Sequence, residues 1–131
     1  MGQDTIFHKI VSKEITAYVI LEDDKHLAFL DIFPAVEGQA LVIPKNYTTS
    51  NFAEADSDLM SSTMLFAQQV AKQMEKKLDN LERVIVIIEG LEIDYLHIKL
   101  FPKYKGKHGP TPHGEKASEA ELMRLQEILS T

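Results

Sequence analysis

The amino-acid sequence predicts an α+β fold: a mostly antiparallel five-stranded sheet with a long central helix, a short N-terminal helix and a C-terminal helix. Short runs of β-branched and other apolar residues alternate with turn-forming residues, and one long stretch repeats its apolar residues at helical spacing. The 131 residues contain no internal repeat and no dividing linker. We therefore expect a single domain over residues 1–131, with the helices on one side of the sheet.

The first part of the chain predicts a short helix and three strands. Residues 5–11 form the helix, which carries several apolar side chains. Residues 17–21 and 26–31 are β-prone runs that flank the turn 22–25, so they predict a hairpin. Residues 40–44 are apolar throughout, which is typical of a strand that is buried on both faces.

The second part predicts the long helix and two further strands. Asp56 or Ser57 is a suitable N-cap for the helix. Residues 83–88 are mostly β-branched and predict a strand, and residues 95–102 predict the next one. The apolar stripe of the helix, which we interpret as its core face, consists of Met60, Met64, Ala67, Ala71, Met74 and Leu78.

The C-terminal part changes in composition. Residues 103–117 are rich in glycine, proline and lysine and predict a loop, and residues 118–130 predict a helix that starts with a capping box at Ser118 and Glu121. Five lysines stand against one acid between positions 99 and 116. This basic strip is suited to attract phosphates, and it is equally well explained as a solvated, mobile loop.

Charge and composition narrow the function classes. The net charge of −6 argues against a general nucleic-acid binder, and no apolar run reaches the ~20 residues that cross a bilayer. Cysteine is absent, which excludes disulfides and thiolate chemistry, and the first residues lack the pattern of a signal peptide. We expect a cytoplasmic protein without a cofactor or metal, because His8, His26, His108 and His113 are too scattered to form a metal site.

His97 is the candidate for chemistry. In an extended strand over 95–102, His97 shares a face with Tyr95 and Lys99. An imidazole in that setting can act as a nucleophile, and the alternative is an ordinary histidine that faces water. The nearby ammonium of Lys99 should lower the pKa of His97 and keep it neutral near pH 7.

Four blocks of the chain resemble the histidine triad (HIT) family: residues 5–11, 22–23, 27–32 and 41–45, in the family's order and nearly its spacing. The similarity extends from Thr5 to about Pro102, and it implies the HIT-like version of the fold described above. The family carries a His-x-His-x-His signature whose middle histidine is catalytic. Counting back from Pro102 places that histidine at His97, with Tyr95 and Lys99 in the first and third positions.

The resemblance implies a homodimer that binds a purine nucleotide and cleaves it at the α-phosphate. Apolar side chains would enclose the base and Asp31 would accept the ribose hydroxyls, although core packing and a turn or capping role are the alternatives. Neutral His97 would attack the phosphorus to form a nucleotidyl-imidazole, assisted by Lys99 and Tyr95. The dimer would form through the long helix and the adjacent strand, about residues 58–88. The candidate nucleotide-binding residues are Ile6, Phe7, Ile10, Asp31, Ile32, Leu41, Gln39 and Glu89.

Several positions depart from the family pattern around the phosphate. Ile88 and Gln39 replace polar or histidine residues, and Glu92 would repel a phosphate unless it points away or meets Lys99. Three functions therefore remain open: a nucleotide hydrolase or phosphoramidase, a nucleotide-binding or sensing protein with weak or absent catalysis, and a dimeric interaction protein. The leaving group and the choice between adenine and guanine are not specified by the sequence.

Overall fold

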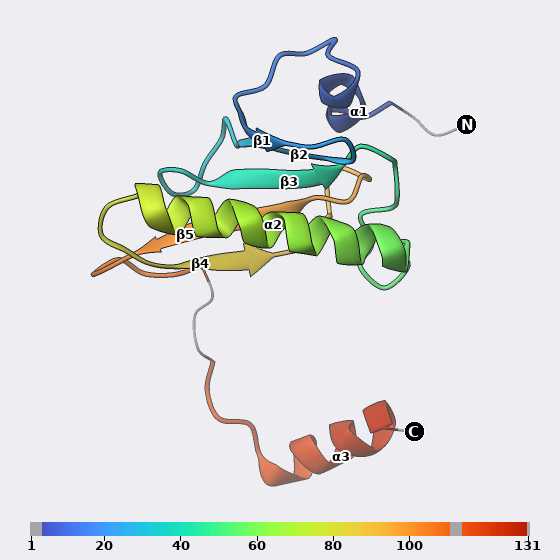
Figure 1. Ribbon diagram of the computed structural model, residues 1–131. Coiled ribbons are helices and arrows are strands. Elements are labelled where there is room, and N and C mark those ends of the chain that lie inside the picture. The colour runs from blue at the N-terminus through green and yellow to red at the C-terminus, as the bar shows by residue number, and fades with distance from the viewer. Residues whose placement is uncertain (1–3, 111–113, 131) are drawn as a thin grey trace.

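The computed structural model describes residues 4–110 and 114–130, and its centre is a five-stranded antiparallel sheet in the order β1-β2-β3-β5-β4 (Figure 1). The predicted number and order of elements are confirmed. The helices are α1 (Ile6–Val11), α2 (Ser57–Lys77) and α3 (Glu119–Ser130), and the strands are β1 (Val19–Glu22), β2 (His26–Leu30), β3 (Ala40–Pro44), β4 (Leu81–Ile87) and β5 (Ile98–Tyr104).

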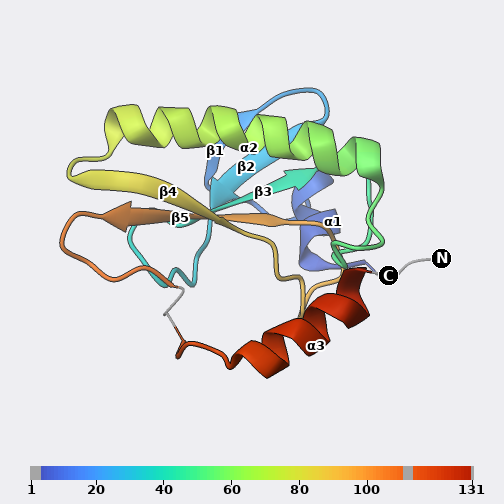
Figure 2. The same cartoon turned by 90° about the horizontal axis from the view of Figure 1, so that it is seen from below.

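The two faces of the sheet carry separate apolar clusters. Alternate residues along each strand point to opposite faces, so Ala28 and Val42 belong to the cluster under α2 while Leu27 and Ile43 belong to the other. Phe7 of α1 packs into this second cluster. The prediction that the helices share one side is therefore wrong: Figure 2 shows α1 and α2 on opposite sides of the strands.

The last strand differs from its predicted bounds. The antiparallel ladder begins at Ile98, because the main-chain N–H of Leu96 donates to the oxygen of Thr48 in a loop rather than to a neighbouring strand. His97 therefore lies one residue before β5. The strand continues through Pro102 to Tyr104; the pairing with β3 has already ended at Leu100, so the missing N–H of proline breaks no hydrogen bond there.

The long helix is capped by Asp56, whose side chain accepts a hydrogen bond from the N–H of Leu59 at 2.9 Å. Its buried face has the predicted period but is rotated toward Thr63, Phe66 and Val70. Phe66 and Val70, which the predicted stripe does not include, are buried there together with Ala67 and Met74 of the stripe.

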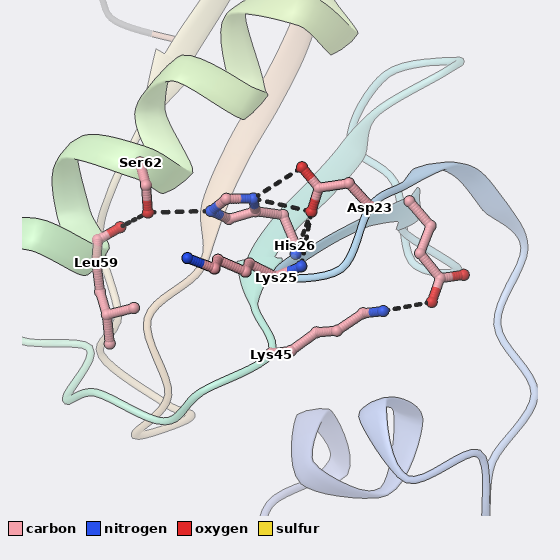
Figure 3. A network of polar contacts seen from close by, with 7 residues as sticks. Asp23, Lys25, His26, Lys45, Leu59 and Ser62 are labelled. Atoms are coloured by element: carbon pink, nitrogen blue, oxygen red, sulfur yellow. Dashed lines mark hydrogen bonds and ion pairs between the residues drawn. The ribbon is translucent and has the colours of Figure 1, made fainter.

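A polar network joins the β1–β2 turn to α2 (Figure 3). Nδ1 of His26 lies 3.1 Å from Asp23 Oδ1, and Nε2 lies 3.0 Å from the hydroxyl oxygen of Ser62. The imidazole ring also stacks on Phe66 with ring centroids 5.1 Å apart. His26 thereby connects the hairpin to the helix that covers it.

The C-terminal helix stands apart from the sheet. In Figures 1 and 2, α3 lies beyond the edge strand β4, on the side of the sheet away from α2. Ser118 caps it as predicted, since its side-chain oxygen accepts from the N–H of Glu121 at 3.2 Å. No residue of α3 is buried. Within the described parts of the chain, no helix is both long enough and apolar enough to cross a membrane.

Candidate functional site

A cavity of about 340 Å³ opens on the face of the sheet opposite α2. It lies between α1, the β2–β3 connection and the segment that leads into β5. Two residues predicted for the site, Tyr95 and Gln39, do not line it. The predicted residues that do line it are Ile6, Phe7, Ile10, Asp31, Ile32, Leu41, Glu89, His97 and Lys99.

His97 is buried, with 6% of its surface exposed, and its ring packs against Phe7 with centroids 4.9 Å apart. Nδ1 lies 2.7 Å from the main-chain oxygen of Tyr95. A carbonyl oxygen can only accept, so Nδ1 carries the proton and Nε2 keeps its lone pair. Burial lowers the pKa of His97 and the ammonium of Lys99 acts in the same direction, against the opposing effect of the Tyr95 hydrogen bond. The ring is therefore held as a neutral imidazole of one defined tautomer.

The side chain of Tyr95 points into the core. Its hydroxyl donates to the main-chain oxygens of Pro44 and Lys45, at 2.7 and 3.1 Å, and burial raises its pKa to about 12. What Tyr95 offers to the site is its main-chain oxygen, which holds His97.

Lys99 and Glu89 form an ion pair at the cavity, with Nζ and Oε1 2.8 Å apart. The hydrogen bond from Lys99 lowers the pKa of Glu89. The carboxylate that pairs with Lys99 is therefore that of Glu89 and not that of Glu92. Glu92 lines the cavity, and its side chain is exposed. Before a phosphate can bind to Lys99, the ammonium must be shared with Glu89 or released from it.

The carboxylate of Asp31 is fixed from two directions. One oxygen accepts from the N–H of Phe33 at 2.9 Å, and the other accepts from Nε2 of Gln39 at 3.0 Å. Gln39 is buried, and its own oxygen accepts from the N–H of Ala35. Each carboxylate oxygen keeps a lone pair for a further donor. Gln39 thus acts behind the cavity wall, by orienting Asp31.

The sequence did not point to much of the apolar lining. Ala17 and Tyr18 were expected in a strand, but β1 begins at Val19, which leaves them at the cavity. Phe29 could have been found, because it shares a strand face with Leu27 under period-two alternation. The remaining lining residues that were not predicted come from loops and strand ends: Ile15, Thr16, Leu30, Phe33, Leu91, Glu92 and Ile93.

Gly90 holds the loop that carries Glu89 and Glu92. Its φ is +62°, and a Cβ atom on it would lie 2.5 Å from the main-chain oxygen of Ser50. The hydroxyl of Ser50 donates to the oxygen of Gly90 at 2.7 Å, and its N–H donates to Asp94. Two adjacent loops are therefore fastened together beside the cavity.

His8 and His108 do not line the cavity. Nδ1 of His8 accepts from the N–H of Thr5 and closes the capping box of α1, while His108 is exposed and His113 lies outside the described residues. Across residues 4–110 and 114–130, no group of three or more histidine, aspartate or glutamate side chains is placed to hold a metal ion.

The sequence and fold of this chain, whose cavity is lined by a buried imidazole and a carboxylate, match a known family. The model of the HIT domain matches residues 12–106. The chain is 35% identical over 123 residues to the adenosine 5'-monophosphoramidase HNT1 of Saccharomyces cerevisiae, a match that covers 94% of this chain and 77% of the yeast protein. This protein belongs to the HIT family.

Solved structures agree with that assignment. A protein of Streptococcus mutans superimposes with a TM-score of 0.81 at 27% identity, over 99% of this chain and 85% of the other. A histidine triad nucleotide-binding protein of Candida albicans superimposes with a TM-score of 0.75 at 25% identity, over 97% of this chain and 95% of the other. The likeness extends over nearly the whole chain.

Proposed function

We propose that this protein is a nucleotide hydrolase or phosphoramidase of the histidine triad type, which cleaves at the α-phosphate of a purine nucleotide. The observation that carries the proposal is the state of His97: a buried, neutral imidazole whose Nδ1 is bound to the oxygen of Tyr95 and whose Nε2 lone pair is available beside a nucleotide-sized cavity. Such a nitrogen is the nucleophile that covalent phosphoryl chemistry needs.

A nucleotide site binds a base, a ribose and a phosphate, and residues that line the cavity would bind the first two. Apolar side chains such as Ile6, Phe7 and Leu41 form walls for the base. Asp31, oriented by Gln39, presents carboxylate oxygens that can accept both ribose hydroxyls. The α-phosphate would then lie toward His97, with the lysine ammonium at the same end of the cavity.

The reaction has two steps. Nε2 of His97 attacks the α-phosphorus, the new P–N bond forms, and the bond to the leaving group breaks with its electron pair on that group. An amine or oxygen leaving group takes a proton from solvent as it departs. Water then attacks the same phosphorus and gives up a proton to solvent, while the P–Nε2 bond breaks with its electron pair on Nε2. Nucleoside monophosphate is released and neutral His97 is regenerated. Lys99 would stabilise the phosphate oxygens as charge develops on them.

The yeast relative suggests which substrate to try first. Because that protein is an adenosine 5'-monophosphoramidase, adenosine phosphoramidate should release AMP with this protein, and His97→Ala should remove the release. His108→Ala, which changes an exposed loop histidine, is the matched control. Mass spectrometry of acid-free quenched samples should detect an added nucleotidyl group on the native chain. Release that persists in His97→Ala would show that another residue is the nucleophile.

One observation favours a second candidate, a nucleotide-binding or sensing protein with little turnover. The ammonium of Lys99 is already paired with Glu89, at 2.8 Å. Calorimetric titration with AMP separates the two functions: tight binding without AMP release from phosphoramidates or dinucleoside polyphosphates would favour the sensor. Failure to bind any purine nucleotide would leave only an interaction protein.

We further propose a homodimer through α2 and β4, working in the cytoplasm. β4 is an edge strand with an unpaired ladder side, and Val86 on it and Leu65 on α2 are exposed apolar residues. A cysteine-free chain suits a reducing compartment. Light scattering at micromolar concentrations gives the mass directly.

A further inference from the structure

The peptide that joins Tyr95 to Leu96 is held from both sides. Its C=O, the main-chain oxygen of Tyr95, lies 2.7 Å from Nδ1 of His97. Its N–H, that of Leu96, donates to the main-chain oxygen of Thr48 at 2.9 Å. This peptide is trans, so its C=O and N–H are coplanar and point in opposite directions. The hydrogen bond to Thr48 therefore fixes the plane in which the Tyr95 oxygen faces the imidazole.

Thr48 is itself anchored at the start of α2. Only 8% of its surface is exposed, and its hydroxyl oxygen accepts a hydrogen bond from the N–H of Asp56 at 2.9 Å. Asp56 is the residue that caps the helix. Through its side chain and its main-chain oxygen, Thr48 thus connects the segment before His97 to the first turn of α2.

A second connection joins the same two segments through the carboxylate of Asp94. One of its oxygens accepts from the N–H of Ser50 at 3.0 Å and from the hydroxyl of Thr49 at 2.8 Å. The other oxygen accepts from the hydroxyl of Tyr47 at 3.0 Å. These hydrogen bonds, the one from the Ser50 N–H first, lower the pKa of Asp94, so the carboxylate is ionised and can only accept. All three donors lie in the loop that contains Thr48.

We propose that Thr48 and Asp94 are positioning residues of the candidate site: they hold the Tyr95–Leu96 peptide so that Nδ1 of His97 keeps its proton and Nε2 keeps its lone pair. Neither residue lines the cavity, so each acts through the backbone that precedes His97. The inference rests on the proposed chemistry of His97 and extends it, because it assigns the tautomer of the nucleophile to two residues outside the cavity.

Nitrogen NMR reads the tautomer directly and without substrate. Well above the ordinary histidine pKa of about 6.5, Nε2 of His97 in the native chain should resonate as an unprotonated ring nitrogen. Thr48→Val removes the hydroxyl but keeps the branched shape, and it should move this resonance toward the average of the two tautomers. Thr48→Ser, which keeps the hydroxyl, should restore it. Thr63→Val makes the same change at a buried threonine whose Oγ1 has no hydrogen-bond partner within the described chain, and it should leave the resonance unchanged.

The kinetics of the proposed reaction give the second measurement. Thr48→Val should lower kcat on the order of 10-fold and leave KM for adenosine phosphoramidate unchanged, because the nucleophile is altered and the cavity wall is not. Burial lowers the pKa of His97 and the hydrogen bond to the Tyr95 oxygen opposes that effect, so weakening the bond should move the acid limb of kcat to lower pH. The charged groups that act on the ring are the same in both proteins: Lys99, Glu89 and Asp31.

Asp94→Ala tests the second connection at an exposed position, where no buried group is lost. It should shift the Nε2 resonance and the acid limb in the same directions as Thr48→Val. Asp24→Ala, which removes an exposed carboxylate from the turn between β1 and β2, should shift neither. If Asp94→Ala and folded Thr48→Val both keep the native resonance, the inference is overturned, whatever the activity. If both variants lose the native tautomer but no protein releases AMP, the proposed function fails and the positioning role stands.

Discussion

Nδ1 of His97 lies 2.7 Å from the main-chain oxygen of Tyr95, two residues earlier in the chain. The contact is local, but it depends on distant parts of the fold. The Tyr95 hydroxyl is bound to Pro44 and Lys45 at the end of β3, and this anchor fixes the carbonyl that fixes the imidazole. The main-chain oxygen of Tyr95, whose side chain does not line the cavity, therefore sets the tautomer of His97, which does line it.

The pH dependence should follow from the lowered pKa of His97. Burial disfavours the imidazolium, so the neutral nucleophile persists below the ordinary histidine pKa of about 6.5. The acid limb of kcat/KM against pH should lie below pH 6.5.

The unfolded chain binds this proton more readily than the folded chain, so the contribution of His97 to stability is present above pH 6.5 and is lost as pH falls toward the folded pKa. Urea unfolding of native protein and His97→Gln over that range measures it, and parallel curves would contradict it.

Lys99→Met should change both the rate and the pH profile. The Lys99 charge lowers the pKa of His97, so its removal should move the acid limb to higher pH, while loss of the ammonium should reduce kcat on the order of 10²-fold. Lys99→Arg, which keeps the charge, should restore the position of the limb. A Lys99→Met enzyme with native kcat would show that the ion pair with Glu89 is structural.

Asp31→Asn should remove the proposed contact with the ribose, and Gln39→Ala should remove a hydrogen bond that orients Asp31. Loss of the Asp31 charge should raise KM for ribonucleotide substrates about 10-fold or more, with no change for 2',3'-dideoxy analogues, which lack the hydroxyls. Gln39→Ala removes one of the two bonds that hold Asp31 and should give a smaller rise in the same direction. Equal losses with ribo and dideoxy substrates would show that Asp31 does not contact the ribose.

The strands were predictable because residues 26–31 and 40–44 are short apolar runs with turn-forming residues on either side. The side covered by α1 was not predictable. The apolar residues of α1 lie on one side of the helix, within about 140° of one another: Ile6, Phe7, Ile10 and Val11. The side of the sheet that they cover depends on the path of the connection 12–18, which no local pattern specifies. Which face of α2 is buried likewise depends on how the helix packs on the sheet, a tertiary effect that brings Phe66 and Val70 into the core.

The candidate site divides in the same way. His97 and Asp31 were predictable from a resemblance that spans most of the chain, and the cavity brings them together with Lys99. The Glu89 partner of Lys99 and the support of Asp31 by Gln39 were not, because each pair joins segments whose distance is set only by the folded sheet. For Tyr95 the residue type suggested that the hydroxyl lies in the site. In the folded chain it is the main-chain oxygen of Tyr95 that contacts a site residue, His97.

Gly90→Ala should damage the site through the backbone. The positive φ and the 2.5 Å approach to the Ser50 oxygen leave no room for a methyl group, so the loop must move or strain. We expect a loss of about 2 kcal/mol in the free energy of unfolding and a raised KM, because Glu89 and Glu92 shift with the loop. Gly106→Ala, also at positive φ but with open space around its Cβ, is the control for backbone strain alone. Equal effects of the two substitutions would assign the loss to φ and not to the Ser50 contact.

Ser62→Ala should weaken the link between the hairpin and α2 without touching the cavity. The hydroxyl oxygen lies 3.0 Å from Nε2 of His26, on the face of the sheet opposite the proposed site, so the variant should lose about 1 kcal/mol of stability and keep its kcat. Ser61→Ala, an exposed neighbour on the same helix, removes the same hydroxyl without that contact and should unfold like the native chain. If Ser62→Ala matched Ser61→Ala in urea, the His26 network would be a solvated contact with no net stabilisation. If it lowered kcat while stability held, the two faces of the sheet would be coupled, since Ala28 under α2 is next in β2 to Phe29, which lines the cavity.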